Sequence, residues 1–191
     1  MSRGFSLVEL MVSVSLFAVV MLVSVGALLS LVDANRKARS LESVMNNLNI
    51  AVDGMVRSMR MGNTFHCNNE EFPSNPEVGG DCPGGEDMIS FAPFGANPTD
   101  NNERWVYSFS GGQLWRSREG GANEVPITAP EVDITDVRFY VVGTIRGNTL
   151  TGDTSQPKVV VVIKGTAGGE NERTATTFYI QATAVQRVLD L

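Results

Sequence analysis

The chain has 191 residues and a formal net charge of −6, from 15 Lys and Arg against 21 Asp and Glu. This acidic balance argues against direct binding of nucleic acid, which needs a basic surface to neutralise phosphates. Two cysteines and one histidine leave little material for a zinc cluster or a Ser-His-Asp triad. The length predicts one domain, or at most two small ones.

The first predicted element is an apolar segment long enough to cross a membrane. Leu10 to Val32 is a run of 23 residues without a charge, and about 20 apolar residues in a helix span a bilayer. A secretory signal peptide, cut near Val25-Gly26-Ala27, would have a shorter apolar run of about 7–15 residues. A plain anchor with Arg3 on the cytoplasmic side explains the length. It leaves Glu9 unexplained, because a carboxylate deep in a membrane helix costs about 2.5–3.5 kcal/mol.

A third interpretation accounts for every residue of this segment. The stretch Gly4-Phe5-Ser6-Leu7-Val8-Glu9-Leu10-Met11, followed by the unbroken apolar run, resembles the type III signal of type IV pilins and type II secretion pseudopilins. The resemblance implies that a prepilin peptidase cuts between Gly4 and Phe5 and methylates the new amino group of Phe5. It covers about residues 1–30 closely and the rest of the chain loosely.

The same resemblance implies a role for Glu9, the fifth residue of the mature chain. In that family, the glutamate of an incoming subunit is thought to meet the N-terminal amine of a neighbour already in the filament. A paired charge in hydrocarbon costs less than an unpaired one, so this assembly charge pair would give subunit addition a direction. Alternatively, Glu9 pairs with the amine of its own chain. Where many pilins have a helix-breaking proline, this chain has only Gly26, which costs about 1 kcal/mol relative to Ala.

Beyond Val32 the pattern becomes amphipathic without a clear stop. We expect one helix over residues 5–61, about 85 Å long at 1.5 Å per residue, with Gly62 as its C-cap. Apolar residues recur at helical spacing and predict a buried face: Leu41, Val44, Leu48, Ala51, Val52, Met55 and Met59. Polar residues fall on the opposite face: Glu42, Asn46, Asn49, Asp53, Arg57 and Arg60.

Residues 62–86 are rich in Gly and Pro and predict an irregular acidic loop. In an extracytoplasmic domain, Cys67 and Cys82 would form a disulfide worth about 3 kcal/mol for a loop of about 15 residues. Zinc binding by His66 with the two cysteines lacks the usual Cys-x-x-Cys spacing. The carboxylates of residues 61–103 are candidate calcium ligands, but they do not follow the EF-hand spacing. We therefore expect no cofactor.

Residues 87–191 predict β-structure. Gly111-Gly112 predicts a hairpin with a two-residue turn, and the apolar run 159–163 predicts a central strand covered on both faces. The expected strands are Asp87–Phe91, Trp105–Ser110, Gln113–Arg118, Asp136–Val142, Lys158–Lys164 and Thr176–Leu189. The predicted fold class is α+β and pilin-like, with the long N-terminal helix packed on an antiparallel β-sheet.

The predicted organisation is a leader (1–4), a transmembrane or filament-core helix (5–32) and an extracytoplasmic domain (33–191). Within that domain we expect the amphipathic helix over 33–61, the disulfide loop over 62–86 and the β-region over 87–191.

No catalytic motif is evident, so we expect a structural subunit rather than an enzyme. The resemblance implies a minor pilin or pseudopilin, assembled into a type IV pilus or a type II secretion pseudopilus. Its expected partners are prepilin peptidase, other subunits, the inner-membrane assembly platform and, before assembly, membrane lipid. The alternative is a mounted binding module that recognises a secreted substrate or a surface; an anchored enzyme is a third hypothesis.

Overall fold

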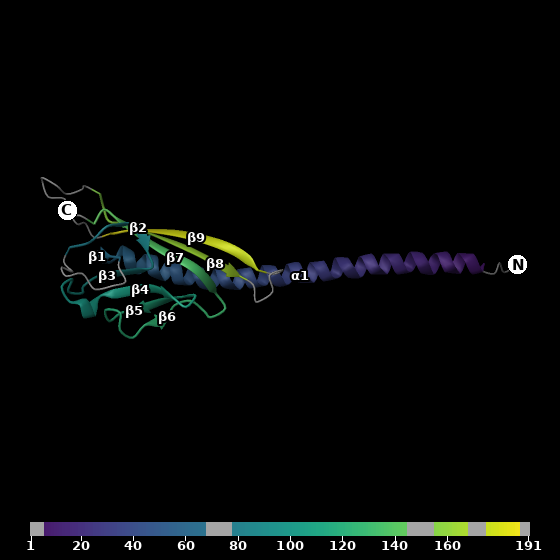
Figure 1. Ribbon diagram of the computed structural model, residues 1–191, viewed down its shortest axis with the longest axis horizontal. Helices are drawn as coiled ribbons and strands as arrows, with labels where there is room; N and C mark the ends of the chain where they lie inside the picture. Colours follow the sequence, from purple (N-terminus) through teal and green to yellow (C-terminus); the bar gives the residue numbers. More distant parts are fainter. Residues whose placement is uncertain (1–5, 68–77, 145–154, 168–174, 188–191) are drawn as a thin grey trace.

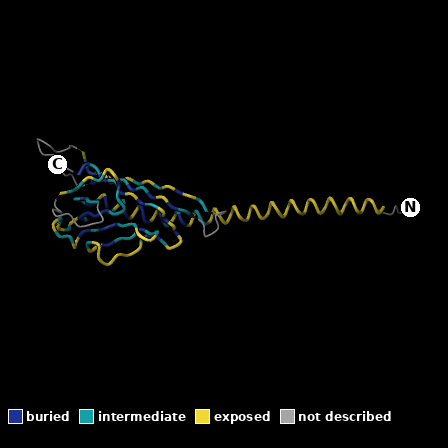
Figure 2. The backbone as a smooth tube through the Cα atoms, in the orientation of Figure 1, coloured by how far each residue is buried: buried dark blue, intermediate teal, exposed yellow. Residues whose placement is uncertain are grey.

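The computed structural model describes residues 6–67, 78–144, 155–167 and 175–187. A single long helix, α1 (Leu7–Arg60, 54 residues), runs through the described structure, and two antiparallel sheets surround its C-terminal half (Figure 1). The N-terminal half of α1 projects from this body and is exposed along its length (Figure 2). The fold is therefore α+β and pilin-like, as the resemblance implies.

Both ends of α1 have local causes. Ser6 caps the N-terminus, and Arg57 and Arg60 lie in the last turn, where cations interact favourably with the helix dipole. No proline interrupts the segment, and the helix continues through Gly26. The expected helix over residues 5–61 is thus confirmed to within two residues at its described start and one at its end.

The strands divide into two sheets in which all neighbours are antiparallel. The first sheet has the order β1 (Asn63–His66), β3 (Met88–Ala92), β4 (Trp105–Ser110), β5 (Gln113–Ser117), β6 (Val125–Pro126). A 3₁₀ turn, η1 (Asn101–Glu103), precedes β4. The second sheet has the order β2 (Cys82–Glu86), β7 (Asp133–Val142), β8 (Lys158–Ala167), β9 (Thr176–Val185). The described structure therefore has two sheets, where the sequence predicts one.

The β4–β5 hairpin forms where the sequence predicts it. Gly111 and Gly112 have φ of 59° and 78°, and positive φ at both central positions is the type I′ geometry that suits two-residue hairpins. Side chains along β9 alternate between the core and solvent. Phe178 and Ala184 are buried while Tyr179 and Thr183 are exposed.

The prediction of an irregular loop over 62–86 is wrong at both ends, because β1 and β2 lie there. Each is an edge strand held by pairing with a distant partner, β3 for β1 and β7 for β2. Edge strands tolerate Pro83 and irregular glycines. Gly85 has φ of 77°, and a Cβ there would lie 2.5 Å from the ring of Tyr140, so a glycine that suggests a loop instead allows close packing of two strands.

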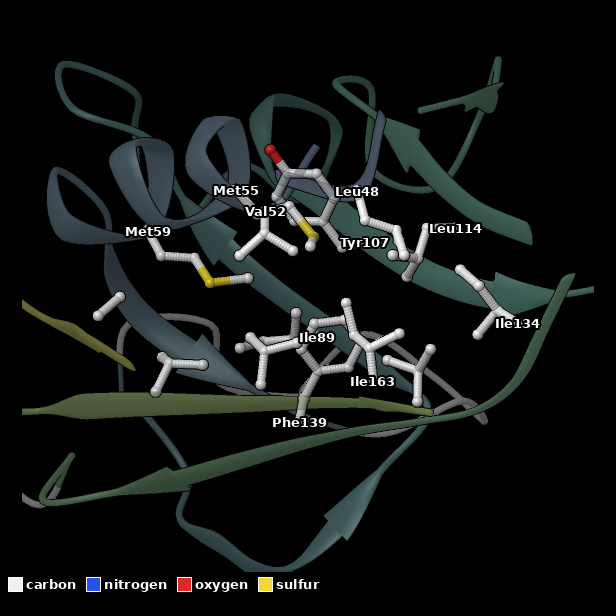
Figure 3. Close-up of a cluster of buried hydrophobic side chains, with 14 of the residues drawn as sticks. Leu48, Val52, Met55, Met59, Ile89, Tyr107, Leu114, Ile134, Phe139 and Ile163 are labelled. Atoms are coloured by element: carbon white, nitrogen blue, oxygen red, sulfur yellow. The ribbon is translucent and has the colours of Figure 1, made fainter. Parts of the chain in front are cut away.

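One core lies between the helix and the two sheets (Figure 3). The predicted apolar helix face is confirmed, since six of its members are buried and Leu41 is half-buried. The buried members are Val44, Leu48, Ala51, Val52, Met55 and Met59. The expectation that 159–163 is covered on both faces is wrong: Val159, Val161 and Ile163 are buried, but Val160 and Val162 are only half-buried. The second sheet packs fully on one face only.

Among the described residues, three polar contacts join α1 to this body. The backbone N–H of Ala129 donates to Oδ1 of Asn47 at 3.0 Å, and the hydroxyls of Ser58 and Tyr107 lie 2.9 Å apart. Burial raises the pKa of Tyr107 above 10.0, so the phenol remains neutral and available for this bond. At the helix end, the N–H of Arg187 donates to the carbonyl of Arg60 at 2.8 Å.

Gly62 has a different role from the predicted C-cap. Met61 is the C-cap, and a Cβ on buried Gly62 would lie 2.3 Å from Cδ2 of Phe91. Because Phe91 is itself fully buried, we expect Gly62→Ala to lower the free energy of unfolding by about 1–3 kcal/mol. Chemical denaturation of the purified chain measures this.

Gly54→Ala is the matched control, since Gly54 is an exposed helical residue with no atom within 4 Å of a built Cβ. It should raise stability by about 0.4–1 kcal/mol. Equal effects of the two substitutions would contradict a packing role for Gly62.

Candidate functional site

The candidate site is the first part of α1, where the sequence motif lies. Gly4 and Phe5 are outside the described residues, so their predicted cleavage and methylation stay predictions. Glu9 lies in the first turn of α1, and its backbone N–H donates to Oγ of Ser6 at 3.3 Å. The helix therefore begins only two residues after the predicted scissile bond.

The helix-capping role of Ser6 is a feature that the sequence interpretation missed, although its signal is present in the sequence. Ser6 and Glu9 have the Ser-x-x-Glu spacing of a capping box. The cap satisfies one of the four N–H groups left without helical partners at a helix start. Glu9 also places a negative charge near the positive end of the helix dipole, worth about 0.3–1 kcal/mol at exposed sites. The carboxylate of Glu9 therefore stabilises the start of α1 within a single chain, without any contact to a second subunit.

The helix surface beyond Glu9 is apolar and unpartnered. No residue between Ser6 and Arg39 is buried or half-buried (Figure 2). An 18-residue window of this helix reaches a mean hydropathy of 2.5 with none of it buried, which makes it a candidate membrane span by length and composition. In water each fully exposed Leu or Val forgoes about 1.5–3 kcal/mol of burial. The segment thus needs lipid or other helices around it.

Hydroxyl groups in this segment bond to the helix itself. Oγ of Ser13 donates to the carbonyl of Glu9 at 2.7 Å, and Oγ of Ser24 donates to that of Val20 at 2.7 Å. Ser15 bonds similarly to Val12 at 2.9 Å. Polar groups in hydrocarbon must be satisfied internally, so these serines suit a lipid-facing helix.

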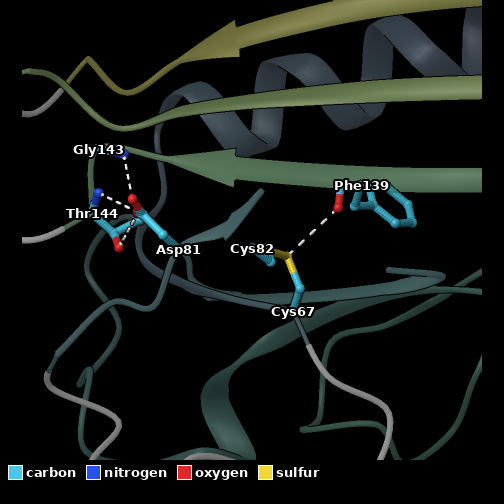
Figure 4. The surroundings of a disulfide bond; sticks show 6 residues. All are labelled: Cys67, Asp81, Cys82, Phe139, Gly143 and Thr144. Atoms are coloured by element: carbon cyan, nitrogen blue, oxygen red, sulfur yellow. Dashed lines mark hydrogen bonds between the residues drawn. A yellow bond between two sulfur atoms is a disulfide. The ribbon is translucent and has the colours of Figure 1, made fainter. Parts of the chain in front are cut away.

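The disulfide lies at the other end of the molecule, in the body (Figure 4). Cys67 follows β1 and Cys82 begins β2, with their Cα atoms 6.1 Å apart. Because β1 and β2 are the edges of different sheets, this bond connects the two sheets covalently. It supports the shape of the body and does not touch the projecting helix.

Asp81, a candidate calcium ligand, is used within the fold. Its carboxylate accepts from the N–H groups of Gly143 and Thr144 at 3.2 and 2.8 Å, and from the hydroxyl of Thr144 at 2.7 Å. The described residues contain no group of three or more His, Cys, Asp or Glu that could hold a metal. Glu70, Glu71 and Glu77, which are also candidate calcium ligands, lie outside the described residues.

A comparison with known protein families identifies the same N-terminal segment. Residues 1–25 match the family described as the prokaryotic N-terminal methylation motif, which is characteristic of type IV pilins and pseudopilins. No curated protein and no solved structure matches the chain. The motif and the unpartnered apolar helix occupy the same stretch of sequence.

Proposed function

We propose that this protein is a structural subunit, a minor pilin or pseudopilin, of a type IV pilus or a type II secretion pseudopilus. Prepilin peptidase removes residues 1–4 and methylates the amino group of Phe5. Before assembly, the mature chain lies in the cytoplasmic membrane, with residues 5–32 in lipid and residues 33–191 outside the cytoplasm. The assembly platform then moves it into the filament, where helices of other subunits replace the lipid.

A single observation carries this proposal: the methylation motif covers the start of a helix whose apolar half packs on nothing in the described part of the chain. A simple anchor would need the apolar length but neither the motif nor Glu9. A helix with its own cap, self-bonded hydroxyls and an apolar surface all round can exchange lipid for neighbouring helices without refolding. The motif points to a structural protein rather than an enzyme.

The experiment is mass spectrometry of the N-terminal peptide of the native protein. We expect the chain to begin at Phe5 with one added methyl group, and to keep residues 1–4 in a strain without prepilin peptidase. A native chain that begins at Met1 would indicate a plain anchor. A start near Leu28 would indicate a secreted domain, and either result would overturn the proposal.

A further inference from the structure

An arginine-lined pocket lies where α1 ends inside the body. It has a volume of about 350 Å³. Its lining residues are Asp53, Val56, Arg57, Arg60, Met61 and Arg187. Three arginines against one aspartate give the lining a net positive charge, on a chain whose formal charge is −6.

Tertiary structure brings the third arginine to this place. Arg57 and Arg60 are three residues apart in the last turn of α1 and are therefore neighbours on the helix surface. Arg187 follows β9, and its backbone N–H bonds to the carbonyl of Arg60 at 2.8 Å. The helix dipole explains why arginines suit the last turn, but it does not explain an arginine from another element.

Asp53 is the one carboxylate of the pocket lining, and no ion pair at bonding distance joins it to these arginines in the described part of the chain. The ion pair found in that part joins Arg138 and Asp136, at 3.2 Å on the second sheet. All three pocket arginines are exposed, so their guanidinium groups are open to an external anion. Val56 and Met61 add apolar surface to the same pocket.

The position of the pocket excludes the lipid headgroups around the chain's own helix. Arg57 lies about 25 residues beyond Val32, which is about 38 Å along a straight helix. Figure 1 shows this end of α1 inside the body, far from the projecting N-terminus. The pocket therefore faces whatever lies beside the body rather than the membrane around the chain's own helix.

We propose that this arginine pocket binds a carboxylate-rich segment of a neighbouring subunit. Guanidinium groups bind carboxylates through paired hydrogen bonds, and the apolar lining suits the methylene groups of Glu side chains. Residues 61–103 of this chain contain eight Asp and Glu without any Lys or Arg, so a second copy of this chain would itself carry an acidic segment of this kind. A contact between a pocket and a different surface of the next molecule is heterologous, and such contacts build open filaments. The inference rests on the proposed function.

The first test uses the full-length chain in detergent with a fluorescent hexaglutamate peptide, followed by fluorescence anisotropy. The triple variant Arg57→Gln, Arg60→Gln, Arg187→Gln should bind at least tenfold more weakly than the native chain. The matched control Arg36→Gln, Arg39→Gln removes two exposed arginines of the same helix outside the pocket and should bind as the native chain does. Added salt should weaken native binding. Equal loss in both variants, or tighter competition by inorganic phosphate than by glutamate, would overturn the proposal.

The second test measures entry of the triple variant into sheared filaments from cells. We expect at least a tenfold loss from the filament fraction, while the N-terminal peptide is still cut and methylated and the chain still reaches the membrane. Native levels in the filament would overturn the pocket proposal alone. A chain that is never processed, in native and variant forms alike, would instead count against the proposed function.

Discussion

Glu9→Gln should reduce the amount of this protein in filaments at least tenfold while leaving its expression unchanged. The substitution keeps the shape of the side chain and removes its charge. Under the proposed mechanism, the N-terminal amine of the neighbouring subunit then remains unpaired in an apolar environment. An unpaired charge there costs about 2.5–3.5 kcal/mol, and about 1.4 kcal/mol corresponds to a factor of ten. Quantitative immunoblotting of sheared filaments against whole cells measures the loss.

Two controls separate assembly from folding and processing. Glu42→Gln changes an exposed glutamate of the same helix beyond the apolar segment and should leave incorporation at the native level. The mass of the N-terminal peptide should show that the Glu9 variant is still cut and methylated. Native incorporation of Glu9→Gln would reject the intersubunit charge pair and favour a bond between Glu9 and its own N-terminus.

Arg104→Ala should lower the free energy of unfolding by about 4 kcal/mol, the largest stability effect we expect in the body. Arg104 is fully buried, and burial lowers its pKa from 12.5 to about 10, so it stays charged at neutral pH. Its guanidinium donates to the carbonyl oxygen of Thr64 and, at 3.2 Å, to its hydroxyl. Truncation leaves a cavity, which costs about 2–5 kcal/mol for a large side chain, and removes the bonds to half-buried Thr64, which adds about 1–3 kcal/mol. Part of this loss of stability is offset, because the Ala variant has no charged group to desolvate on folding.

Arg104 matters for stability because its bonds hold the backbone of Thr64 in an unfavourable conformation. Thr64 has φ of 46°, a conformation that is rare and strained for a β-branched residue. Two bonds from one guanidinium hold it there, at the irregular register between β1 and β3.

Arg104→Met provides the comparison, because it fills most of the volume and makes neither bond. We expect it to lose about 1–3 kcal/mol, less than the Ala variant. Chemical denaturation of both purified variants checks the order, and native stability for Arg104→Met would show that the bonds to Thr64 contribute nothing.

The sequence alone determined the parts of this protein whose cause is local. The charge-free run from Leu10 to Val32, the motif around Glu9 and the helical spacing of apolar residues from Leu41 to Met59 all predict one helix and its two environments. Gly111-Gly112 likewise predicts a hairpin, because the turn geometry depends on those two residues themselves. In each case, residues within a few positions supply the physical reason.

The tertiary structure decided what depends on partners far away in the chain. β1 and β2 are strands because β3 and β7 pair with them, and the number of sheets follows from those pairings rather than from any local pattern. The ring of Phe91 leaves no room for a Cβ at Gly62. Arg104 can be buried because Thr64 accepts hydrogen bonds from its guanidinium. The arginine pocket exists because the end of β9 returns to the end of α1. Such long-range contacts are selected by how well the whole core packs, which no short window of sequence contains.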